Sequence, residues 1–111
     1  MKPHWILVAN ATEARLLQQE TGKALVLLNA CDGEGHLHFA RDIADQLEQG
    51  AREHAYAWLA VYASSDFLGE LRQLFGEATR KLLAGTHEAD LTGFSVAEIE
   101  RRMRQERSRA H

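Results

Sequence analysis

Two uninterrupted apolar runs, residues 5–9 and 57–63, constrain the fold more than any other feature of this sequence. Neither run shows the polar alternation of a half-exposed strand, and each is followed by a polar residue. Runs of this length are typical of strands that are covered on both faces. Both are far shorter than the ~20 apolar residues that a membrane-spanning helix needs. The chain is therefore expected to bury a sheet between covering helices.

Three more segments predict strands. Residues 13–20 and 24–30 follow the first apolar run across short turns, so these three strands are expected to form an antiparallel meander. Residues 81–88 predict a short fifth strand, which comes after the second apolar run. The sheet is therefore expected to have five strands of mixed direction.

Three helices are predicted by apolar residues at spacings of three and four. They begin near His36, Asp66 and Ser95, and Gly76 is expected to interrupt or end the second. The third begins with a capping-box pattern, in which Ser95 and Glu98 satisfy reciprocal backbone donors. The order β-β-β-α-β-α-β-α predicts an α/β fold, a ribonuclease H-like three-layer domain around a mixed five-stranded sheet. We expect this single domain to occupy residues 1–111.

Charge and cysteine content narrow the class of protein. The net charge is −3, so the chain as a whole has no basic field for nucleic acid. A single cysteine, Cys31, excludes an internal disulfide, and no signal-peptide pattern opens the sequence. We expect a cytoplasmic protein with no cofactor and no membrane partner.

The C-terminal segment is the one locally basic part of the sequence. Residues 95–111 carry five arginines against three glutamates, a net charge of +2, which leaves −5 for the rest of the chain. Residues 101–111 are expected to form a basic helical tail that frays toward its end. The tail is either a surface for phosphate, RNA or an acidic protein, or a solvated helix with Glu98–Arg102 and Glu100–Arg104 pairs. The candidate binding residues are Arg101, Arg102, Arg104, Arg107 and Arg109.

A polar loop before the first helix is the candidate functional loop. Its candidate residues are Asp32, Gly33, Glu34, His36 and His38. Alternating acids and histidines could ligate a metal ion in an extended segment, whereas acids near a helix N-terminus also favour the helix dipole. Ribonuclease H-like nucleases need converging acids, including one on the first strand, and residues 5–10 contain none. We therefore expect no metal site and no catalytic residue.

A homodimer is a further possibility for this chain. It would be favoured by an exposed apolar stripe on the second helix, formed by Phe67, Leu71 and Phe75.

Three short segments resemble one bacterial family. Residues 5–17 are similar to its opening strand and the alanine-arginine-leucine strand that follows. Residues 63–72 resemble its alanine-rich strand end with Phe-Leu-Gly and Leu-Arg, and residues 89–92 resemble the Lys-Asp-Leu-Thr before its last helix. On these segments the chain resembles the bacterial host attachment protein family, which is also described as release-factor-like. This family is similar to the central domain of eukaryotic class 1 release factors and of Pelota.

The resemblance implies a fold and a translation-related role, but not peptide release. The release-factor domain carries a Gly-Gly-Gln loop before a helix that contains Phe-Ala-Arg, and residues 39–41 match that helix. The Gly-Gly-Gln positions then fall on Asp32, Gly33 and Glu34, so the glutamine is absent and the loop is short. A carboxylate there would repel the anionic end of tRNA.

We therefore expect a non-catalytic host attachment domain that binds the ribosome, tRNA or another protein. The alternative is an RNA ester hydrolase or a metal-dependent nuclease that uses residues 32–38.

Overall fold

A mixed five-stranded sheet forms the centre of the molecule. The structure is a computed structural model, which describes residues 2–32 and 38–109, and side chains as far as residue 105. The strands, in the order in which they lie in the sheet, are β3 (Val26–Asp32), β2 (Glu13–Gln19), β1 (His4–Ala9), β4 (Trp58–Ala63) and β5 (Leu83–Glu88). β2 is antiparallel to β1 and to β3, whereas β4 is parallel to β1 and to β5. The predicted meander and the mixed sheet are confirmed.

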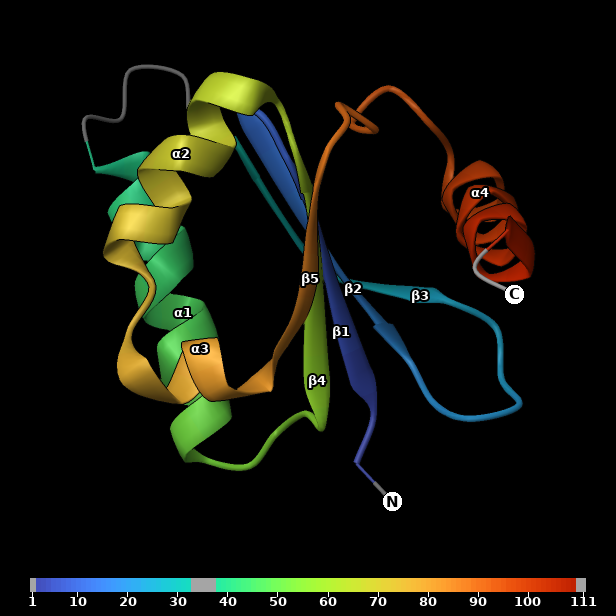
Figure 1. Cartoon of the computed structure of the whole chain (residues 1–111), viewed down its shortest axis with the longest axis horizontal. Coiled ribbons are helices and arrows are strands. Elements are labelled where there is room, and N and C mark those ends of the chain that lie inside the picture. Colours follow the sequence, from blue (N-terminus) through green and yellow to red (C-terminus); the bar gives the residue numbers. More distant parts are fainter. Residues whose placement is uncertain (1, 33–37, 110–111) are drawn as a thin grey trace.

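Helices cover both faces of this sheet (Figure 1). α1 (Phe39–Arg52), α2 (Ser65–Leu74) and α3 (Glu77–Leu82) lie on one face, and α4 (Val96–Arg109) lies alone on the other. Side chains alternate between the two faces along β1: Leu7 joins the core under α1, while Ile6 and Val8 join the core under α4. This two-sided burial explains why both apolar runs lack polar residues. Within the described residues, no helix is both long and apolar enough to cross a membrane.

The short third strand begins two residues later than the sequence predicts. The backbone N–H of Leu25 donates to the Glu100 carboxylate at 2.7 Å, and the Leu25 side chain is buried in the core under α4. Residue 25 is thus held by a helix rather than by the strand ladder. β3 therefore runs from Val26 to Asp32, and the expected loop residues Cys31 and Asp32 belong to the strand.

A short helix, α3, replaces the first part of the expected fifth strand. Its N-terminus is held by Glu48 of α1, whose carboxylate accepts the backbone N–H groups of Ala78 (3.3 Å) and Thr79 (2.9 Å). A Cβ at Gly76 would collide with this carboxylate, so a larger residue there would displace Glu48 from the start of α3. The predicted break at Gly76 is confirmed, and β5 starts at Leu83.

The glycine at position 50, inside α1, is explained by a packing contact that the sequence does not reveal. A Cβ at this position would lie 2.7 Å from the Trp5 ring, so the glycine lets Trp5 rest directly on α1. Trp5 in turn stacks on Tyr56 with ring centroids 4.4 Å apart, and the Tyr56 hydroxyl donates to the Leu47 carbonyl at 2.9 Å. The close packing of Trp5 on α1 thus offsets the low helix propensity of glycine.

Candidate functional site

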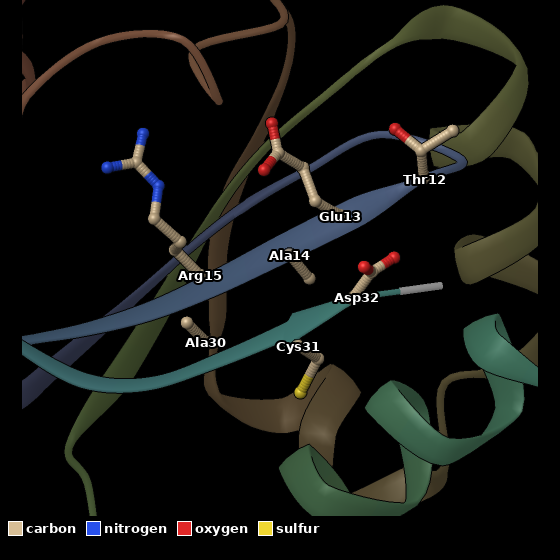
Figure 2. Close-up of a pocket in the computed structure, with 7 residues that line it drawn as sticks. All are labelled: Thr12, Glu13, Ala14, Arg15, Ala30, Cys31 and Asp32. Atoms are coloured by element: carbon tan, nitrogen blue, oxygen red, sulfur yellow. The ribbon is translucent and has the colours of Figure 1, made fainter. Parts of the chain in front are cut away.

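The clearest concave surface lies where β2 begins and β3 ends. It is an open hollow of about 660 Å³ (Figure 2), and its lining residues are Thr12, Glu13, Ala14, Arg15, Ala30, Cys31 and Asp32. The strand register places Glu13 opposite Asp32 and Arg15 opposite Ala30. Cross-strand partners point to the same face, so the two carboxyl groups lie side by side on the α4 face of the sheet. Figure 2 shows Ala14 and Cys31 pointing the other way, toward α1.

Arg15 ties the segment before α4 to the wall of this hollow. Its Nη2 donates to the carbonyl oxygens of Leu91 (2.9 Å), Thr92 (2.8 Å) and Phe94 (2.6 Å). Its Nε is buried and has no hydrogen-bond partner among the described atoms. The guanidinium is therefore committed to the backbone of residues 91–94 and acts as a structural strap.

A second polar cluster holds the same segment from the end of β1. The Asn10 amide donates to Asp90 (2.9 Å) and to the Thr92 hydroxyl (3.0 Å), and its oxygen accepts the backbone N–H groups of Thr12 and Glu13. Hydrogen bonds from the Thr92 hydroxyl and then from Asn10 lower the pKa of the Asp90 carboxyl. Asn10 thus links the start of β2 to the segment that leads into α4.

These two clusters connect two of the three segments that resemble the family. Asn10 and Arg15 come from the segment 5–17, and their partners Asp90, Leu91 and Thr92 come from the segment 89–92. Sequence reasoning missed this contact because three of the acceptors are backbone carbonyls, which leave no trace in the residue types. The Asp90-x-Thr92 and Asn10-x-Thr12 spacings, typical of turns closed by a side chain, were the available signal.

The structure describes only two of the five candidate loop residues. Asp32 is the exposed last residue of β3, on the rim of the hollow, and His38 is the exposed residue that precedes α1. The His38 side chain makes no capping hydrogen bond to the helix. Gly33, Glu34 and His36 lie outside the described residues. Within residues 2–32 and 38–109, no three His, Cys, Asp or Glu side chains are grouped so that they could hold a metal ion.

The arginines of α4 whose side chains are described are exposed, and two of them contact neighbouring side chains. The predicted capping box is confirmed: the Ser95 N–H donates to Glu98 at 3.0 Å, and the Glu98 N–H donates to the Ser95 hydroxyl at 3.2 Å. The Glu100–Arg104 pair is also confirmed, at 2.7 Å. The Arg102 guanidinium, expected beside Glu98, lies over the Phe94 ring at 5.8 Å from its centroid. The side chains of Arg101, Arg102 and Arg104 are exposed, and those of Arg107 and Arg109 lie outside the described side chains.

The apolar stripe on the second helix, which would favour a homodimer if it were exposed, is buried. Phe67, Leu71 and Phe75 are 3%, 0% and 4% exposed, because α2 packs this side onto the sheet and α1. Apolar residues at helical spacing indicate that one side of a helix is covered. They do not indicate whether the chain's own sheet or a partner chain covers it. Among the described residues, the large exposed apolar side chains lie on β3.

Comparison with known proteins gives a family and two similar folds. The family described as "Protein required for attachment to host cells" matches residues 29–103, about two thirds of the chain. No curated protein matches the sequence. A solved archaeal protein shares 15% identity with a TM-score of 0.60, over 86% of this chain and 32% of its own. An archaeal translation termination factor shares 12% identity with a TM-score of 0.61, over 96% of this chain and 39% of its own.

The chain thus spans well under half the length of either solved protein. At such identities the likeness shows the fold alone. The mixed five-stranded sheet with helices on both faces is similar to one part of a translation termination factor.

Proposed function

The chain belongs to the family of proteins required for attachment to host cells, and on that premise we propose that it is a non-catalytic binding module related to translation. The proposed partner is the ribosome or tRNA, contacted through the arginines of α4. The observation that carries the proposal is that Arg101 and Arg102 are exposed on α4, while the Glu98 and Glu100 carboxylates are engaged in other contacts.

The two glutamates of α4 whose side chains are described, Glu98 and Glu100, are occupied by structural contacts. The Glu98 carboxylate accepts the Ser95 N–H, and the Glu100 carboxylate accepts the Leu25 N–H as well as Arg104. Arg101 and Arg102 remain exposed on α4, which Figure 1 shows on the other face of the sheet from the remaining helices. Exposed arginines on one helix face suit phosphate groups, because each guanidinium offers a fork of donors.

The absence of peptide-release activity is part of the proposal. Asp32 stands where the release-factor motif begins, and its cross-strand neighbour is Glu13. Two carboxyl groups on one face make the hollow unfavourable for the phosphates at the end of a tRNA. The hollow is therefore unsuited to position an ester for hydrolysis.

Three further properties complete the proposal. The strand order β3-β2-β1-β4-β5, with only β2 reversed, supports a ribonuclease H-like fold. Residues 1–111 act as one domain, with residues 101–111 as its basic tail. The protein acts in the cytoplasm and needs no cofactor.

Cosedimentation with ribosomes at low and moderate salt tests the proposed partner. The variant Arg101→Glu/Arg102→Glu should lose most binding, and binding by the native protein should weaken with salt because phosphate contacts release counterions. Lys81→Glu is the matched control, since Lys81 is exposed on α3, on the opposite face of the sheet. Equal binding by all three proteins would contradict the proposed surface. Hydrolysis of peptidyl-tRNA, or metal-dependent cleavage of RNA, by the pure protein would instead favour the enzymatic alternative.

A further inference from the structure

The outer edge of β3 is the most exposed apolar feature among the described residues. Val26, Leu27 and Leu28 are 50%, 47% and 43% exposed, although each is a large aliphatic residue in a strand. β3 is the last strand of the sheet, next to β2 alone (Figure 1), so one row of its backbone groups points away from the sheet. An apolar strand at an open edge is a template for pairing with another strand.

β3 carries few of the features that protect sheet edges. Proteins blunt an edge with charged residues, proline or bulges, and residues 24–31 contain neither a charge nor a proline. A bulge is present, because Leu16 pairs with Asn29 and Leu17 with Leu27, which leaves Leu28 as the extra residue. The opposite edge strand, β5, exposes Ala84 and the polar residues His87 and Glu88. The apolar edge is thus confined to one side of the sheet.

We propose that two copies of this chain pair through antiparallel β3 strands. The segment begins after Lys23 and ends at Asp32, so its two ends carry opposite charges. Antiparallel pairing brings the Lys23 end of each copy beside the Asp32 end of the other, twice in one dimer, whereas parallel pairing would set like ends together. Lys23 is 72% exposed and has three donors, one of which contacts Glu20 at 2.8 Å.

The pairing buries the exposed aliphatic residues against one another. A two-fold axis near Leu27 and Leu28 sets the aliphatic part of one strand opposite the same part of its copy. This axis runs perpendicular to the joined sheet, so both α4 helices lie on the same face. The dimer would then present two arginine surfaces side by side, which strengthens binding to an extended partner without a new contact.

Sedimentation of the purified protein at several concentrations tests this dimer. The native chain should reach twice its monomer mass of 12.5 kDa. Leu27→Lys should weaken the dimer about a hundredfold. The substitution occurs once in each copy, and each occurrence is expected to weaken the dimer about tenfold. Ala84→Lys places the same charge on the other edge strand and should leave the dimer intact. A monomer at every concentration, or a dimer that Leu27→Lys leaves unchanged, would overturn the proposal.

A charge exchange tests the antiparallel direction. Lys23→Glu and Asp32→Lys should each weaken the dimer, and the double variant should recover it because both contacts are restored with reversed sign. Failure of the double variant to recover, with each single variant shown to be folded, would contradict the antiparallel pairing. Amide exchange of the native chain gives a second measure: protection of residues 26–32 should rise with protein concentration. No ribosome is present in these experiments, so their outcome is independent of the proposed partner.

Discussion

Two charged side chains, Glu48 and Arg15, perform the same task on opposite faces of the sheet. Glu48 holds the start of α3 to α1 by accepting backbone N–H groups, and Arg15 holds residues 91–94 to β2 by donating to backbone carbonyls. Each fixes a segment far away in the sequence. The anion uses donors at a helix start, whereas the cation uses acceptors in an irregular segment.

The difference lies in how completely each charge is compensated. Glu48 accepts hydrogen bonds from the Thr79 N–H and hydroxyl, from Arg52 and from the Ala78 N–H. The bond from the Thr79 N–H is the largest of the causes that lower the pKa of Glu48 to about 2, against a smaller effect of desolvation. Arg15 donates to its three carbonyl partners through Nη2, and its Nε has no partner among the described atoms. The α3 attachment therefore depends on a carboxylate, whereas Arg15 holds residues 91–94 without one.

The largest effect is expected for Arg15→Met. Three carbonyl groups lose their donor, which costs about 3 kcal/mol of the free energy of unfolding at about 1 kcal/mol each. Amide exchange of α4 should rise at the same time, because residues 91–94 position this helix. Urea unfolding measures the first effect, and Arg41→Met on the exposed side of α1 is the control, with an expected change within about 0.5 kcal/mol. Equal losses of stability in both variants would contradict the proposal that Arg15 holds residues 91–94 to β2.

Glu48→Gln should cost about 2 kcal/mol at neutral pH. Glutamine keeps the shape of the side chain but loses the charge that strengthens the bonds to Thr79, Ala78 and Arg52. Thermal unfolding at neutral pH measures the loss. Glu77→Gln, at the exposed start of α3, is the matched control and should change little. A loss no larger than that of the control would show that packing alone holds α3.

Acid should abolish most of this difference. The pKa of Glu48 is about 2 in the folded protein against an ordinary 4.5, so the carboxylate stabilises the fold fully above pH 4.5. This stabilisation is lost as the pH falls from 4.5 through about 2. The unfolding free energies of the native protein and Glu48→Gln should therefore converge over this range. Parallel pH curves for the two proteins would mean that Glu48 is not the acid-sensitive group.

The contrast between these two contacts also shows what the sequence could predict. The apolar runs at 5–9 and 57–63 and the Ser95–Glu98 capping box are local patterns, and each is confirmed. α3 was missed because its anchor, Glu48, lies 31 residues before Thr79 in the sequence. The strap at Arg15 was missed because it binds carbonyl groups 76 to 79 residues away. Candidate residues of the loop 33–37 stay predictions.

The smallest effects on stability are expected for alanine substitutions of two helical glycines. They test how much close packing contributes on the face of the sheet that α1 covers. Gly69 of α2 has no atom near the position of an added Cβ, so Gly69→Ala should stabilise the protein by about 0.5–1 kcal/mol through helix propensity. Gly50→Ala gains the same propensity but forces Trp5 away from α1, so a net loss of about 1 kcal/mol is expected. Urea unfolding of both variants measures the pair, and Trp5 fluorescence should change in Gly50→Ala alone. Stabilisation by both substitutions would mean that Trp5 repacks freely, and that the α1 face is held by Glu48 more than by close packing.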